Sequence, residues 1–69
     1  MDMRKLVGAN VARARREKSL TQEVLSEKSG LSQQYISGLE RGHRNPTIVT
    51  LYEIASALDV SPASLLTPQ

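Results

Sequence analysis

The stretch Leu20–Gly42, LTQEVLSEKSGLSQQYISGLERG, decides the fold because two short segments in it open with the same pattern. Thr21 begins the first segment and Ser32 begins the second, each preceded by a leucine. A hydroxyl side chain at such a position can cap a helix by accepting a hydrogen bond from a backbone N–H. The leucine before it can pack on the fourth helical residue. Gly30 and Gly42 follow the segments and favour the left-handed conformation that ends a helix. The pattern therefore predicts a helix-turn-helix.

The second of these helices has an outward face without apolar or acidic residues. Ile36 and Leu39 recur at helical spacing and should face the interior. The outer side carries amides, a hydroxyl, glycine and a guanidinium, contributed by Gln33, Gln34, Ser37, Gly38 and Arg41. Glutamine can pair with an adenine edge in the major groove of DNA, and arginine with guanine or a phosphate. We predict base contacts from Gln33, Gln34, Ser37 and Gly38; the alternative is a plain solvated helix face.

Specific positions in this stretch carry a likeness to a known family: Gln22, Leu25, Ser26, Gly30, Leu31, Ile36, Leu39, Glu40 and Gly42. With these spacings the chain resembles the Xre-type helix-turn-helix family, which includes phage repressors, Cro-like proteins and restriction–modification controller proteins. The resemblance runs from about Val7 to Leu66. It implies an all-α fold, a compact five-helix lambda-repressor-like DNA-binding domain with the helix-turn-helix as helices 2 and 3. Ser19 and Gly38 depart from the family, which commonly has glycine at the first position and a long base-reading side chain at the second.

The resemblance also implies a structural ion pair between Arg15 and Glu40. In the family, an arginine on the first helix pairs with the glutamate that ends the recognition helix. A partner for Glu40 is physically needed if it lies near the core, because an unpaired buried carboxylate is costly. The alternative is two separate surface charges, which would contribute little to stability.

A second set of residues is predicted to contact the DNA backbone. Gln22 opens its helix, where a side-chain amide and free backbone N–H groups can hold a phosphate oxygen. The loop after the recognition helix is rich in hydrogen-bond donors, and further basic residues lie off the apolar stripe of the first helix. The full set is Gln22, Tyr35, Arg41, His43, Arg44, Asn45 and Arg16. His43 is the only histidine and has no nearby cysteine or second histidine, so a metal or catalytic role is not expected.

The remaining segments supply the core and a possible dimer surface. The first helix should run to about Lys18, with an apolar stripe of Leu6, Val7, Val11 and Ala14. A fourth helix is predicted over about 48–58, with Ile48, Leu51, Ile54, Ala55 and Leu58 on its inner stripe, Tyr52 packing at the stripe's edge and Asp59 ending it. A fifth helix should cover about 62–66. Val49, Leu65 and Leu66 are the candidates for a dimer interface.

Composition excludes several classes of protein. The 69 residues predict a single domain, 1–69, with the helix-turn-helix at 21–41. The absence of cysteine excludes disulfides and thiolate metal sites, and no apolar run or leader suggests a membrane or export. We expect a cytoplasmic protein without metal, cofactor or enzymatic activity.

Charge is unevenly distributed along the chain. The net charge is only +2, but Met1–Lys18 carries six basic and two acidic residues, whereas Pro46–Gln69 carries two acids and no base. A polyanion should meet the basic end.

The sequence therefore predicts a regulator of transcription that binds double-stranded DNA specifically. We expect a repressor that acts as a homodimer on a palindromic operator, because one helix-turn-helix covers too few base pairs for tight specific binding. Its recognition helix, about 33–41, should enter the major groove. Two alternatives remain open: an antitoxin-like or other protein-binding helical module, and a restriction–modification controller protein.

Overall fold

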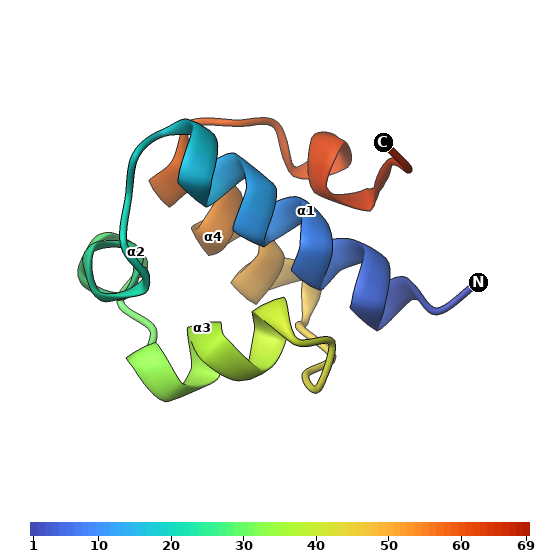
Figure 1. Ribbon diagram of the computed structural model, residues 1–69, viewed down its shortest axis with the longest axis horizontal. Coiled ribbons are helices and arrows are strands. Elements are labelled where there is room, and N and C mark those ends of the chain that lie inside the picture. The colour runs from blue at the N-terminus through green and yellow to red at the C-terminus, as the bar shows by residue number, and fades with distance from the viewer.

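The computed structural model describes residues 1–69 and is entirely helical (Figure 1). Its elements are α1 (Met3–Glu17), α2 (Gln22–Ser29), α3 (Gln33–Glu40), α4 (Ile48–Leu58) and η1 (Pro62–Leu66). In Figure 1, α1 crosses the middle of the fold in front of α4, α2 is seen end-on, and α3 forms the lower edge. The recognition helix is therefore at the surface of the molecule, supported from one side. None of the helices is both long and apolar enough to cross a membrane.

The hydroxyl caps predicted at Thr21 and Ser32 start their helices in the structure, and Thr47, the residue before the predicted fourth helix, does the same for α4. The side-chain oxygens of Thr21, Ser32 and Thr47 accept hydrogen bonds from the backbone N–H groups of Val24, Tyr35 and Thr50, respectively. Each bond satisfies one of the N–H groups that a helix start leaves without an intrahelical partner. These predictions are confirmed.

Helix ends use the left-handed backbone conformation at the expected places. Gly30 has φ 78° and Gly42 has φ 80°, and Asp59 ends α4 with φ 57°. Ser19 also has a positive φ, 59°, a conformation that glycine adopts without steric cost. A residue with a side chain is less stable in this region by about 1–2 kcal/mol, so Ser19 is a point of local strain between α1 and α2.

The predicted fifth helix is not an α-helix. Residues Pro62–Leu66 form a 3₁₀-helix, capped by the Ser61 side chain and held by a bond from the Ser64 N–H to the Ser61 carbonyl. Such i to i+3 bonds are favoured in segments of one turn, which cannot build a run of i to i+4 bonds. The fold is thus four α-helices and one 3₁₀-helix, so the predicted count of five helices is not confirmed: the last segment has the predicted bounds but is not α-helical.

One apolar cluster holds the helices together, with Leu25 from α2, Ile36 and Leu39 from α3, and residues of α1, α4 and η1 around them. Two residues of α4 that were predicted to pack inward are exposed instead. Ile48 is 84% exposed and Tyr52 is 63% exposed. Together with Val49, 64% exposed, they form an apolar surface that we call the α4 face.

A buried asparagine fixes the C-terminal segment on α1. Asn10 is only 3% exposed, and its Nδ2 donates hydrogen bonds to the carbonyl oxygens of Leu65, at 2.9 Å, and Thr67, at 3.0 Å. Its Oδ1 accepts a bond from the Arg13 guanidinium. Every polar group of Asn10 is therefore used. This attachment also buries Leu65, which is 1% exposed.

The dimer surface predicted from sequence needs a correction for this reason. Leu65 belongs to the core of one chain and offers no surface to a partner. Leu66, by contrast, is 44% exposed, so it and Val49 remain candidates.

Helix α1 passes unusually close to the end of α3. A Cβ atom on Gly8 would overlap the backbone oxygen of Leu39 and would lie 2.9 Å from that of Glu40. Only glycine allows the two backbones to approach this closely. The contact sets how the end of the recognition helix sits on the rest of the fold.

Candidate nucleic-acid interface

Helix α3 presents two adjacent amides at its first turn. Gln33 and Gln34 are exposed directly after the Ser32 cap, while Ile36 and Leu39 on the opposite side are fully buried. Because the buried pair fixes the rotation of the helix, the two glutamines have to face outward. Ser37 lies one turn further on and is partly exposed. The glutamine amides can each donate and accept hydrogen bonds, as reading a base edge requires.

The outer side of α3 and the loop after it enclose a shallow hollow with no apolar lining. Its walls are Gln34, Ser37, Gly38, Arg41, His43 and Arg44. The structure thus brings three predicted base-contacting positions together with three predicted backbone-contacting residues. Asn45 is separate from this group: it lines a different hollow with Met3, Arg4 and Pro46. Arg16, on the last turn of α1, is exposed outside both hollows.

The side chain of Arg44 lies across α3 rather than beside it. Its guanidinium carbon is 5.5 Å from the centroid of the Tyr35 ring. Gly38 is buried, and a Cβ built on it would be 3.2 Å from the Arg44 Nε. The outer surface at this position is therefore formed by the arginine side chain, whereas the sequence predicted a base contact from the glycine itself.

The ion pair Arg15–Glu40 lies beneath the recognition helix. The Arg15 Nε is 2.7 Å from the Glu40 Oε2, and its second nitrogen, Nη2, is 3.1 Å from Oε1. The two side chains are only 12% and 6% exposed. Hydrogen bonding to the carboxylate raises the pKa of Arg15, and this outweighs the opposing effect of burial. The pair joins α1 to the last residue of α3.

Gln22 takes part in the same network. Its Nε2 donates to the Glu40 Oε1 at 3.0 Å, while the Arg15 Nη1 donates to the Leu20 carbonyl at 2.8 Å. Part of the Gln22 amide is therefore engaged by Glu40. A phosphate at the predicted site could still be bound by the backbone N–H groups of the first turn of α2 and by the rest of that amide. The network fixes the start of α2 relative to the end of α3.

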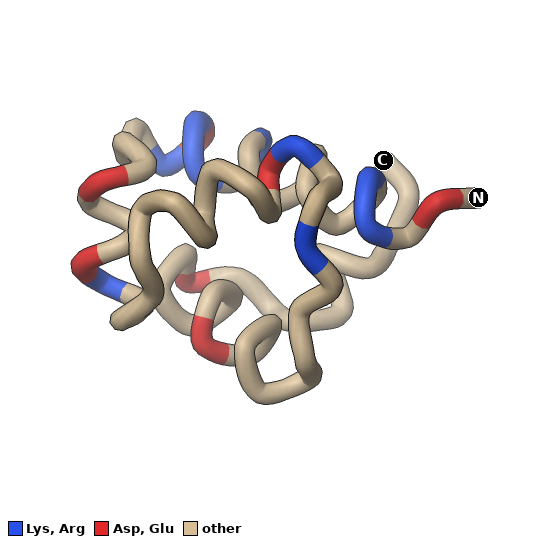
Figure 2. Tube along the Cα trace, turned by 90° about the horizontal axis from the view of Figure 1, so that it is seen from below, with Lys and Arg blue, Asp and Glu red and all other residues tan.

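Charge is unevenly distributed around α3. Figure 2 views the fold from below, and blue segments of α1 and of the turn after α3 lie along one side of that helix. Red segments predominate on α2 and around α4, although some red also stands among the blue on α1 and at the end of α3. A phosphate backbone would be attracted to the basic side of α3 and repelled from the acidic segments of α2 and α4.

One basic residue near this turn was not singled out from sequence. Lys5 packs against Gly42, where an added Cβ would be 2.9 Å from the lysine Cγ. Its backbone lies beside the turn that carries Arg41 and His43. The basic start of the chain was visible in the sequence, but only the crossing of α1 over α3 at Gly8 shows which lysine reaches the turn.

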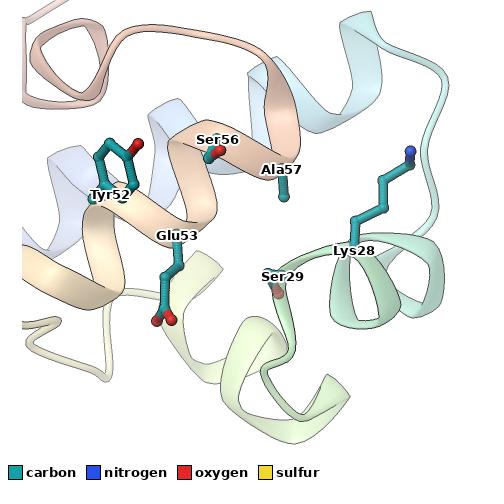
Figure 3. Close-up of a pocket in the computed structure, with 6 residues that line it drawn as sticks. All are labelled: Lys28, Ser29, Tyr52, Glu53, Ser56 and Ala57. Carbon is teal, nitrogen blue, oxygen red and sulfur yellow. The ribbon is translucent and has the colours of Figure 1, made fainter.

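A third hollow lies away from α3, between the end of α2 and α4 (Figure 3). It is lined by Lys28, Ser29, Tyr52, Glu53, Ser56 and Ala57. In Figure 3 the side chains of Lys28 and Tyr52 stand at opposite ends of the hollow and both point upward, whereas that of Glu53 points down from α4. The polar groups do not converge on one point, as they would in a site for a small ligand.

Two short helices that meet at Gly30, the second with an all-polar face at the surface of the molecule, define a helix-turn-helix domain of the DNA-binding kind. The chain belongs to the helix-turn-helix family, whose model matches residues 11–65. This membership confirms the Xre-type resemblance of the sequence.

Relatives and solved structures agree with the family. The chain is 68% identical to the uncharacterized HTH-type transcriptional regulator y4dJ of Sinorhizobium fredii, over 99% of this chain and 88% of that protein. It is 44% identical to the control protein C.SmaI of Serratia marcescens, over 100% of this chain and 82% of that protein. The structure superposes on the restriction–modification controller protein C.Esp1396I, solved as a tetramer with its natural 35-base-pair operator. The TM-score is 0.86 at 40% identity, covering 94% of this chain and 86% of that chain.

Proposed function

We propose that this protein is a transcriptional regulator that binds double-stranded DNA specifically, with α3 in the major groove, and represses from a palindromic operator. The observation that carries the proposal is the outer face of α3, where Gln33, Gln34 and Ser37 are presented and no apolar side chain is exposed. Base edges in the major groove offer hydrogen-bond donors and acceptors that such a face can match. The relatives described above are named as a transcriptional regulator, a control protein and a controller protein, and none of them is named as an enzyme.

We assign the contacts to the DNA backbone to the residues around this face. The exposed groups Arg41, His43 and Arg44, together with Lys5, surround the end of α3 and can approach phosphates. Gln22 offers the start of α2, Tyr35 its hydroxyl, and Asn45 and Arg16 lie further out. Contacts of this kind fix the register of the protein on the duplex without reading sequence.

A homodimer is part of the proposal. The α4 face, Ile48, Val49 and Tyr52, is apolar and exposed, and Leu66 adds a further exposed apolar side chain. Burying these residues against a second copy would remove apolar surface from water. Two recognition helices related by a two-fold axis would then read half-sites about 34 Å apart.

A narrower role is favoured by the similarity to control proteins. C.SmaI is named as a control protein and C.Esp1396I as a restriction–modification controller protein, and this chain covers most of each. The second candidate function is therefore a controller protein that acts on the operator of such a system. Selecting bound duplexes from a random pool and locating the selected site in the source genome would separate this role from general repression.

Replacing Gln33 or Gln34 by alanine is expected to weaken binding to the selected duplex by about 1–3 kcal/mol and to change binding to scrambled DNA little. The reason is that a lost base contact matters only where the right base is present. Fluorescence anisotropy with both duplexes, over a series of salt concentrations, measures the effect. Arg41→Ala is the matched control, because loss of a phosphate contact should weaken both duplexes alike and flatten the salt slope by about one unit. Equal losses on both duplexes for the glutamine variants would move base reading to other residues.

The same titration decides between this function and a protein-binding module. A DNA-binding domain should lose affinity for duplex DNA steeply as salt rises, because bound phosphates release counterions. A chain that shows no salt-sensitive binding to any selected duplex would favour the antitoxin-like alternative.

Val49→Glu is expected to turn the dimer into a monomer, because a carboxylate buried in an apolar interface is strongly unfavourable. Sedimentation at micromolar to high micromolar concentration measures the change. Ala9→Glu, which adds the same charge on an exposed position of α1, should leave the dimer intact. A wild-type chain that stays monomeric at high micromolar concentration, both free and on the operator, would contradict the dimer.

A further inference from the structure

Gly38 is the only glycine on the reading side of α3, and the structure puts a side chain on top of it. A Cβ atom at this position would lie 3.2 Å from the Arg44 Nε, 3.4 Å from its Cγ and 3.8 Å from its Cδ. The first of these distances is shorter than ordinary contact, so the arginine would have to give way. The Arg44 side chain can therefore follow its present path only because residue 38 is glycine and has no side chain.

The backbone returns Arg44 to this place through the end of the helix. The His43 N–H donates to the Gly38 carbonyl at 2.9 Å, and the Gly42 N–H donates to the Leu39 carbonyl at 3.0 Å. This pair of bonds is a Schellman motif, and the positive φ of Gly42 allows it. The motif turns the chain back over the last turns of α3, so that the next residue, Arg44, points across the helix.

A third contact holds the charged end of the side chain. The guanidinium carbon is 5.5 Å from the centroid of the Tyr35 ring, which is within the range of a cation–π interaction. Arg44 forms no salt bridge: the two in the structure are Arg4–Asp2 and Arg15–Glu40. The positive charge is thus oriented by an aromatic ring and a glycine, and it is still available to an anion.

We propose that Gly38 and Tyr35 are positioning residues that hold the Arg44 guanidinium ready on the outer face of α3. Gly38 then acts through Arg44, and not by letting the duplex approach the helix closely. The inference rests on the proposed function. An arginine that is already ordered loses less conformational freedom when it binds, and one such ordered side chain contributes about two- to tenfold in affinity.

The deciding experiment is a double-mutant cycle between Gly38→Ala and Arg44→Ala, read by anisotropy on the selected duplex. In the wild-type background, Gly38→Ala should weaken binding by about two- to tenfold. In the Arg44→Ala background it should have no further effect, since the side chain that it displaces is gone. Thermal unfolding should show no loss of stability, because alanine is a better helix former than glycine.

An equal loss from Gly38→Ala in both backgrounds would overturn the proposal. That result would mean that the added methyl group meets the duplex itself. Stable folding with no loss of affinity in either background would overturn it as well.

Tyr35 provides a second test that does not need DNA. In the free protein, proton NMR should show the Arg44 δ-methylene signals shifted upfield by the Tyr35 ring current. Tyr35→Phe keeps the ring and should keep this shift, whereas Tyr35→Leu and Gly38→Ala should reduce it. Signals at ordinary positions in the wild-type chain would contradict the placement of Arg44. Failure of the wild-type chain to bind any duplex would instead count against the proposed function, and the NMR result would still stand.

Discussion

An alanine at position 8 is expected to lower the free energy of unfolding by about 2 kcal/mol, although alanine normally favours a helix. The added Cβ would overlap the backbone oxygen of Leu39 and would lie 2.9 Å from that of Glu40. Backbone atoms cannot rotate away as a side chain can. The clash therefore has to be relieved by moving α1 away from the end of α3, which disturbs the packing of Val7 and Val11 in the core.

Urea denaturation followed by circular dichroism measures this loss. Gly38→Ala is the matched control, because it makes the same change inside a helix where the neighbouring atoms belong to the flexible Arg44 side chain. It should leave the stability unchanged or raise it by up to about 1 kcal/mol. A Gly8→Ala variant with a urea midpoint at or above that of the wild type would mean that the two helices do not touch at this point.

Glu40→Ala should cost about 1–4 kcal/mol of stability, well above the effect of an ordinary surface change. It leaves the Arg15 guanidinium, 12% exposed, without its carboxylate, and it removes the acceptor of the Gln22 amide. Arg15→Ala should lower the stability by a similar amount, because it leaves the buried Glu40 carboxylate without its partner. The double variant should lose less than the sum of the two, since both changes remove the same interaction.

A denaturation cycle with the wild type, the two single variants and the double variant tests this coupling. Glu53→Ala, an exposed carboxylate on α4, is the control and should stay within about 0.5 kcal/mol of the wild type. Fully additive losses would show that the two residues do not interact in solution. The Glu40→Ala variant should also bind DNA less well than its remaining stability explains, because the network orients both ends of the helix-turn-helix.

Sequence reasoning succeeded where the determinants are local. Thr21, Ser32 and Thr47 cap their helices with hydrogen bonds that span three residues, and Gly30 and Gly42 need only their own backbone freedom. Such signals are complete within a short window, so they can be read without knowing what packs where.

It was less successful where position along a helix decides the outcome. Ile48 lies on the same stripe as Leu51, yet it is exposed, because periodicity gives the direction around the axis and says nothing of where the neighbouring helices stop. Leu65 looked like an apolar residue on a late, separate helix. Its burial depends on Asn10, which is distant in sequence and whose carboxamide gives no apolar signal.

For the candidate site, the sequence predicted which residues take part better than it predicted how they are arranged in space. Gln33 and Gln34 follow from the cap and the helical period. The path of Arg44 across Gly38 requires the turn at Gly42 and the Tyr35 ring together, and a residue-type pattern predicts the turn but not where the Arg44 side chain lies after it. The contact between Lys5 and Gly42 likewise needs the crossing of two helices that the sequence alone does not place.

The attachment of the C-terminal segment by Asn10 has a practical consequence for labelling. Because Asn10 binds the carbonyl groups of Leu65 and Thr67, the chain is fixed to α1 almost up to Gln69. In Figure 1 this end leaves the fold on the upper side, away from α3 at the lower edge. A fluorophore or reporter protein joined after Gln69 would emerge behind the helix-turn-helix, so that single-molecule tracking could follow the protein without covering its groove-facing surface.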